Sequence, residues 1–211
     1  MLLLKAEGDF QEIQLLTGKL TTAHLKEVLK TLLLQRAQNS DLVLYFTGHG
    51  FTAGDEFEQT GLFATYDCRR AQQNGLSFTW LNKVIERASL SSLAMFLDCC
   101  ESEYFIENAL LEESLQSLAK KSCFFAAACR TFENAYALKS AQYSFFTGAM
   151  LAALQQREQG LITASDVYKH IETQLRGQGQ EPVYIGRGNS IPLLDYRRQE
   201  PVTATVSEET P

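Results

Sequence analysis

The sequence has little of several residue types, and each shortage excludes a class of protein. It has 4 prolines and 13 glycines among 211 residues, and no low-complexity stretch before its last fifteen residues. Collagen-like and Pro-rich disordered chains are therefore excluded. The 19 Lys and Arg against 25 Asp and Glu give a formal net charge of -6, and the basic residues are scattered along the chain. A nucleic acid is therefore not an expected partner.

Long hydrophobic runs are also missing. No segment approaches the roughly 20 apolar residues that a membrane helix requires, and the apolar run Met1–Leu4 is too short for the core of a signal peptide. We therefore expect a soluble, cytoplasmic protein with no membrane partner. With 45% hydrophobic and 21% charged residues, the chain is long enough for one domain with a well-buried core.

Cysteine is present but not in a pattern typical of disulfides or metal sites. The five cysteines are Cys68, Cys99, Cys100, Cys123 and Cys129. Their number is odd and two are adjacent, a spacing that strains a disulfide between them, so reduced thiols are expected. The sequence has no C-x-x-C pair, and its three histidines lack ligand spacing. We therefore expect no structural metal.

Apolar residues along the chain predict strands that alternate with helices. Strands are expected at 12–16, 41–46, 61–66, 93–97, 122–128 and 181–185, and helices at about 22–33, 77–88, 105–119, 143–156 and 163–176. This alternation is typical of an open, mostly parallel α/β sheet with helices on both faces. The last strand contains a proline and is expected at a sheet edge.

Two of the predicted strands end in turns that carry reactive side chains. One leads into Thr47-Gly-His-Gly50 and the other into Asp98-Cys-Cys-Glu-Ser102. Functional groups collect at the carboxyl ends of parallel strands, so His49 can take the proton of the Cys100 thiol and make it a nucleophile. The N–H groups of Gly50 and Cys100 can then form an oxyanion hole. Taken alone, both side chains could equally be inert packing groups.

The two motifs resemble those of caspase-like cysteine peptidases. Tyr45-Phe-Thr-Gly-His-Gly50 is similar to the family's histidine motif and Leu97-Asp-Cys-Cys-Glu-Ser102 to its cysteine motif, with bacterial orthocaspases and metacaspases as the closest type. Further agreement is found at Ala128–Arg130, Glu133–Tyr136, Phe145–Ala149 and Gln180–Pro182. The resemblance covers about residues 10–195. It implies a three-layer caspase-like fold and a cysteine-type endopeptidase, with His49 as general base and Cys100 as nucleophile.

The resemblance also implies a substrate and a place for self-cleavage. In metacaspase-like members the aspartate at the position of Asp98 lines a pocket for Arg or Lys, so a protein substrate with a basic residue before the cleaved bond is the expected partner. Thr47 and Glu133 are further candidates for this pocket. The alternative is that Asp98 only caps the turn after it. Lys120-Lys121 is a candidate self-cleavage site, or else a basic helix C-terminus.

The family's halves can be assigned along the chain. A peptidase domain is expected at 1–196, with a large-subunit-like half at about 1–104, a linker helix at about 105–121 and a small-subunit-like half at about 122–196. Residues 197–211 have little to bury and are expected to form a disordered tail. Cys99 is expected to be a buried neighbour of the nucleophile. No run resembles a calcium loop, so no cofactor is expected, although the calcium dependence of many metacaspases leaves that question open.

Two features depart from the family's pattern. The family commonly has Cys-His-Ser-Gly where this chain has Cys100-Glu-Ser-Glu103, so the loop after the nucleophile is expected to differ in shape. Family domains begin with a central strand and a helix, of which Met1–Ala6 supplies at most the end of the helix. The usual first strand is therefore expected to be missing. Without it, the two neighbouring strands must close the gap or leave backbone N–H and C=O groups unpaired, unless a further domain or a partner chain supplies the strand.

This second departure keeps three readings of the chain open. It is a fragment, a gene product whose start is assigned too late, or a catalytically inactive caspase-like module that acts as a regulatory or interaction scaffold. The last of these is the alternative to the peptidase. The intact pair of His49 and Cys100 favours the enzyme.

Overall fold

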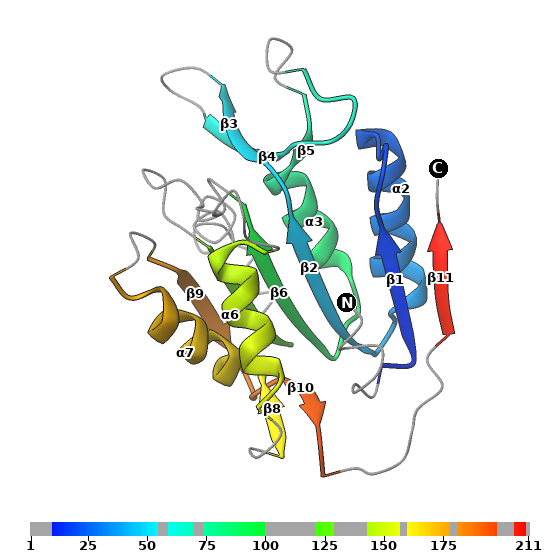
Figure 1. Ribbon diagram of the computed structural model, residues 1–211. Helices are drawn as coiled ribbons and strands as arrows, with labels where there is room; N and C mark the ends of the chain where they lie inside the picture. Colours follow the sequence, from blue (N-terminus) through cyan, green and yellow to red (C-terminus); the bar gives the residue numbers. More distant parts are fainter. Residues whose placement is uncertain are drawn as a thin grey trace.

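The computed structural model describes residues 10–54, 59–69, 74–99, 121–128, 143–156, 160–177, 181–197 and 205–209. In this part of the chain a four-stranded sheet lies between helices on both faces (Figure 1). Strands β2 (Asp41–Thr47), β6 (Ser92–Asp98) and β7 (Ser122–Ala127) are parallel neighbours, and β9 (Val183–Arg187) pairs antiparallel with β7. This mixed, mostly parallel sheet is of the α/β class that the sequence predicted.

Two pairs of helices form the outer layers. One face of the sheet is covered by α2 (Thr22–Thr31), the π-helical turn η1 (Leu32–Arg36) that continues it, and α3 (Phe78–Arg87). The other face is covered by α6 (Phe145–Leu154) and α7 (Ala164–Leu175). None of the helices in the described ranges combines the length and the apolar character needed to cross a bilayer.

The central strand β6 separates two hydrophobic cores. Leu93, Met95 and Leu97 point into the core under α2 and α3, whereas Ala94 and Phe96 point into the core under α6 and α7. Each of these side chains is at most 1% exposed. A strand that is buried on both faces has a continuous run of apolar residues, and this run allowed β6 to be predicted from the sequence.

Helix starts follow the capping signals in the sequence. The Thr21 hydroxyl accepts a hydrogen bond from the backbone N–H of His24 at the start of α2. Thr163 and Asp166 form a capping box at the start of α7, in which each side chain accepts from the other residue's backbone N–H. Such caps satisfy N–H groups that a first turn leaves unpaired, and both predicted helices are confirmed.

Two small antiparallel sheets surround the main one. Strands β3 (Gly50–Gly54), β4 (Gln59–Phe63) and β5 (Leu76–Ser77) form one, and β8 (Leu161–Thr163) pairs with β10 (Pro192–Asp195) in the other. Of these strands only β4 was predicted, at 61–66. The others are short, and their partners lie in other segments of the chain, so local sequence carries little signal for them.

Strand β1 (Glu12–Leu16) does not join the four-stranded sheet. It pairs in parallel with β11 (Thr205–Glu209), and the two lie beyond the β2 side of the sheet (Figure 1). Five residues of the tail at 197–211 that was expected to be disordered thus form a strand, whose main chain pairs with β1. The prediction depended on apolar side chains to bury, and the tail has few of them.

β2 is therefore an edge strand in the described part of the chain. Its side chains from Leu42 to Phe46 are half-buried, although they belong to the same two cores as those of β6. No described strand is hydrogen-bonded to the outer side of β2.

Candidate active site

The turn that carries His49 begins where β2 ends. Thr47 of β2 lies opposite Asp98 of β6 as the last pair of the parallel ladder, and the Gly48 N–H donates a hydrogen bond to the Asp98 carbonyl oxygen at 3.3 Å. The His49 side chain is exposed. A Cβ at Gly48 would lie 2.9 Å from Cζ of Phe46, so any other residue at this position would require the Phe46 ring to shift.

The backbone after His49 is fixed by β4. The Ala64 N–H donates to the His49 carbonyl oxygen at 2.8 Å, and Gly50 lies opposite Phe63. In an antiparallel ladder this pattern marks a non-hydrogen-bonded pair, in which both residues turn their own N–H and C=O groups away from the partner strand. The Gly50 N–H therefore points to the outer edge of β3, which is the end strand of its sheet.

Three aromatic rings in tilted contact lie next to this turn. The ring centroids of Phe46 and Phe63 are 4.4 Å apart, and those of Phe63 and Phe78 are also 4.4 Å apart. Phe63 and Phe78 are at most 2% exposed. Aromatic contacts of this kind each add about 1 kcal/mol beyond the area that they bury, so the strand end under His49 is firmly anchored.

Asp98 is buried, and one of its carboxylate oxygens accepts two hydrogen bonds. The residue is 4% exposed, and its Oδ2 atom accepts hydrogen bonds from the hydroxyls of Ser144 and Thr147 at the start of α6. These partners are 46 and 49 residues away in the chain. These contacts join β6 to α6. They differ from the alternative prediction, in which Asp98 caps the turn that directly follows it.

A third hydroxyl extends this cluster to β2. The Tyr45 hydroxyl lies 2.6 Å from the Thr147 hydroxyl, and because the Thr147 proton goes to Asp98, Tyr45 is the donor of this bond. Burial raises the pKa of Tyr45, and the charge of Asp98 raises it further. We call Tyr45, Asp98, Ser144 and Thr147 the hydroxyl–carboxylate cluster. Sequence reasoning missed its hydroxyls, since only Ser144 carries a local signal, as the N-cap of α6.

The remaining predicted residues are placed as follows. Thr47 is exposed at the end of β2, and Cys99 is 1% exposed, as expected for a buried neighbour. Cys100, Glu133 and Lys120 lie outside the described residues. Among the described residues no group of three His, Cys, Asp or Glu side chains could hold a metal ion.

Lys121 has a defined structural contact. Its ammonium group donates hydrogen bonds to the carbonyl oxygens of Ile85, at 2.9 Å, and Ala88. Both carbonyls lie at the C-terminal end of α3, where unpaired carbonyl groups and the helix dipole favour a cation. Partial burial lowers the pKa of Lys121. These contacts fit the interpretation of a basic helix end, but the helix is α3. The helix predicted at 105–119 lies outside the described residues.

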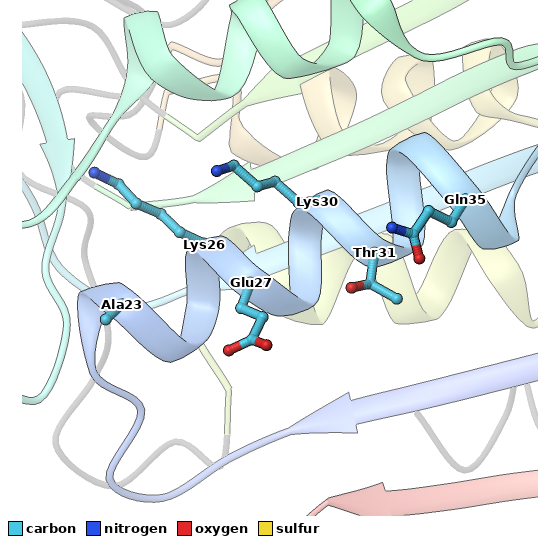
Figure 2. Close-up of a pocket in the computed structure, with 6 residues that line it drawn as sticks. All are labelled: Ala23, Lys26, Glu27, Lys30, Thr31 and Gln35. Atoms are coloured by element: carbon cyan, nitrogen blue, oxygen red, sulfur yellow. The ribbon is translucent and has the colours of Figure 1, made fainter.

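One surface hollow lies away from these strand ends. It has a volume of about 400 Å³ and is lined by residues of α2 and η1, namely Ala23, Lys26, Glu27, Lys30, Thr31 and Gln35 (Figure 2). Lys26 and Lys30 hold their ammonium groups 5.4 and 6.0 Å from the ring of Trp80. The hollow contains none of the reactive side chains, so we place the candidate site at the ends of β2 and β6.

Comparison with known proteins defines the class of this molecule. The family model of the caspase domain (Peptidase_C14) matches residues 5–202. The chain therefore belongs to the caspase-domain family of cysteine peptidases. Among solved structures it is similar to protein GSU0716 from Geobacter sulfurreducens, with a TM-score of 0.56 and 15% identity over 81% of this chain and 74% of that chain. That likeness is one of fold. No curated protein matched the sequence.

Proposed function

We propose that the protein is a cysteine endopeptidase that uses His49 and Cys100 and cleaves after Arg or Lys. The observation that carries this proposal is the register of β2 and β6, in which Thr47 lies opposite Asp98. His49 and Cys100 each follow this pair by two residues. The two motifs of the caspase-domain family thus leave the sheet at one edge and from adjacent strands.

The reaction follows from these groups. His49 takes the proton of the Cys100 thiol, and the thiolate attacks the carbonyl carbon of the scissile bond. The N–H groups of Gly50 and Cys100 stabilise the oxyanion, and each donor contributes about 3 kcal/mol to the transition state. The intermediate collapses to a thioester as His49 gives its proton to the leaving amine. Water, deprotonated by His49, then hydrolyses the thioester and restores the thiol.

The substrate's basic side chain is proposed to reach Asp98, with Thr47 and Glu133 also lining the pocket. A buried carboxylate is costly unless a cation or several donors stabilise it. In the described part of the chain Asp98 has hydroxyl donors and forms no ion pair with Lys or Arg. An Arg or Lys side chain of the substrate would supply the missing positive charge.

Cleavage of short peptides tests the proposal. Matched peptides with Arg, Lys or Asp before the reporter group are incubated with the wild type, with Cys100→Ala and with Cys68→Ala as a control. We expect the wild type and the control to cleave the two basic peptides, and Cys100→Ala to have no activity above background. Equal rates for the wild type and Cys100→Ala would refute the enzyme. Cleavage of only the Asp peptide would refute the role of Asp98.

Self-cleavage is proposed at the bond after Lys120. The residue before a cleaved bond must place its side chain in the pocket, but the ammonium group of Lys121 is held by Ile85 and Ala88. Cleavage after Lys120 leaves these bonds intact. Intact-mass measurement during incubation of the wild type should show two fragments that join at 120 and 121. A chain that stays whole while it cleaves peptides would exclude self-processing.

The outer edge of β2 supports a second candidate function, that of an interaction scaffold. An edge with unpaired backbone groups and apolar residues on both faces is a template for strand addition. We propose that a further domain or a partner chain supplies this strand. Hydrogen exchange tests the idea with the peptide Ser-Leu-Ala-Met-Phe-Leu-Asp, which copies β6. Its addition should protect those amides between Leu42 and Phe46 that point away from β6, and unchanged exchange there would count against the scaffold.

A further inference from the structure

The two oxygens of the Asp98 carboxylate are not equivalent. Oδ2 accepts two hydrogen bonds, one from Ser144 and one from Thr147. A carboxylate oxygen has two lone-pair sites, so Oδ2 is saturated. Within the described ranges no hydrogen bond reaches Oδ1. Asp98 therefore has one oxygen left for a ligand.

The two hydroxyls are held in the donating direction. Ser144 Oγ accepts the Thr147 backbone N–H at 3.0 Å, which leaves its own proton for Asp98. Thr147 Oγ1 accepts from the Tyr45 hydroxyl at 2.6 Å, which leaves its proton for Asp98 as well. A chain of hydrogen bonds in which each donor polarises the next is stronger than its isolated members. A ligand would have to break this chain to use Oδ2.

A single free oxygen discriminates between the two basic side chains. The guanidinium group of Arg is a rigid planar fork that gains most from two carboxylate oxygens at once. The ammonium group of Lys is a compact point charge that needs only one. We infer that the Asp98 pocket selects Lys at least as well as Arg, and that Ser144 and Thr147 determine this specificity through their hold on Oδ2. The inference rests on the proposed function only in taking Asp98 as the group that meets the substrate cation.

The residue that tests the inference most sharply is Thr147. In Thr147→Val the side chain keeps its shape but loses the hydroxyl, so one lone-pair site of Oδ2 becomes available for a guanidinium group. In Thr147→Ser the hydroxyl remains, and the variant is the matched control. A merely structural role of Thr147 would weaken binding of all ligands alike. A change in the ratio of Lys to Arg affinity is specific to the state of Oδ2.

Binding is measured without catalysis, in the Cys100→Ala background, so that the result does not depend on an active enzyme. The probes are fluorescein-labelled Ala-Ala-Xaa-Ala-Ala peptides in which Xaa is Lys, Arg or the neutral norleucine, and the readout is fluorescence anisotropy. We expect the Lys peptide to bind at least as tightly as the Arg peptide, and both to bind more tightly than norleucine. Thr147→Val should change the ratio of the Lys and Arg peptide affinities about tenfold in favour of Arg. A change of this size corresponds to one additional charge-assisted hydrogen bond.

Three results would overturn the inference. The first is an Arg peptide that binds more tightly than the Lys peptide in the Cys100→Ala protein. The second is an unchanged ratio in Thr147→Val, provided that its thermal unfolding shows a folded protein; Ser144→Ala replaces it if it does not fold. The third is equal binding of all three peptides, which would remove Asp98 from the pocket. The peptidase proposal is decided separately, by the cleavage that depends on Cys100.

Discussion

Thr47 and Asp98 are the last residues of neighbouring parallel strands and pair with each other, but they differ in their exposure to solvent. The end of β2 is exposed from Thr47 through His49, whereas Asp98 is 4% exposed and bonded to α6. One strand end thus presents a side chain to solvent, and the other anchors a helix to the sheet.

This difference suits the two tasks of a hydrolytic site. A general base must approach a substrate and exchange a proton with it, so it belongs on an accessible turn. A group that sets specificity must be held by its neighbours in one geometry. The comparison predicts that changes at the exposed end alter rate without altering stability, and that changes at the buried end alter both.

The largest effect is expected for His49→Ala. Loss of a general base typically costs two to four orders of magnitude, so kcat/KM for a Lys peptide should fall by about 10³. Because the side chain is exposed, the free energy of unfolding should change by less than about 0.5 kcal/mol. Urea unfolding and peptide kinetics measure both, with His24→Ala as the matched control. A marked loss of stability in His49→Ala would contradict the predicted difference between the exposed end of β2 and the buried end of β6.

The next largest effect is expected for Asp98→Ala. It leaves the half-buried hydroxyls of Ser144 and Thr147 without their acceptor, so the free energy of unfolding should fall by about 3 kcal/mol. Thr47→Ala, at the same level of the neighbouring strand, should cost less than about 0.5 kcal/mol. Asp98→Asn keeps an acceptor oxygen and should lie between them. Similar unfolding midpoints for Asp98→Ala and Thr47→Ala would contradict the comparison.

A third test moves to the opposite end of the sheet, where Lys121 precedes β7. Lys121→Met keeps most of the aliphatic stem but loses the hydrogen bonds to Ile85 and Ala88. The free energy of unfolding should fall by about 1–2 kcal/mol. Lys83→Met, at an exposed position of α3, should be nearly neutral. Equal stability of both variants would mean that the α3 C-terminus does not need this cation.

The smallest effect is expected for Tyr45→Phe, and it depends on pH. Loss of one neutral hydrogen bond to Thr147 should cost about 1 kcal/mol at neutral pH. Burial raises the pKa of Tyr45 in the folded state, so the folded protein keeps this proton after the unfolded chain has lost it. The stability that Tyr45 contributes is complete below its unfolded pKa of about 10 and is lost as the pH rises through the folded pKa.

The difference in the free energy of unfolding between the wild type and Tyr45→Phe should therefore decrease as the pH is raised from about 9 to about 11. Urea unfolding at several pH values measures it. Tyr66→Phe removes an exposed hydroxyl and should show no such difference. A difference that stays constant over this range would mean that the Tyr45 phenol ionises equally in both states.

Much of the main sheet could be predicted from the sequence. The residues of β6 and β7 form continuous apolar runs because both faces are buried, and Thr21 and Thr163 mark the starts of their helices through their side chains. These signals act over a few residues. The histidine turn and the position of Asp98 at a strand end follow from the same local patterns.

The rest could not be predicted, because it depends on contacts between distant residues. The bonds from Ser144 and Thr147 to Asp98 span 46 and 49 residues, and no local pattern assigns a carboxylate to a hydroxyl so far away. Pairing of β1 with β11 joins residues from opposite ends of the sequence. Main-chain pairing of that kind leaves little trace in side-chain periodicity.

The β1 and β11 pair has a practical consequence for any shortened version of the protein. The family match ends at residue 202, and a truncation at that boundary would look natural from sequence comparison. It would remove Thr205–Glu209, the strand to which β1 is hydrogen-bonded in the described part of the chain. Glu12 at the start of β1 would keep its ion pair with Arg36. Residues 205–209 thus help to hold β1 in place.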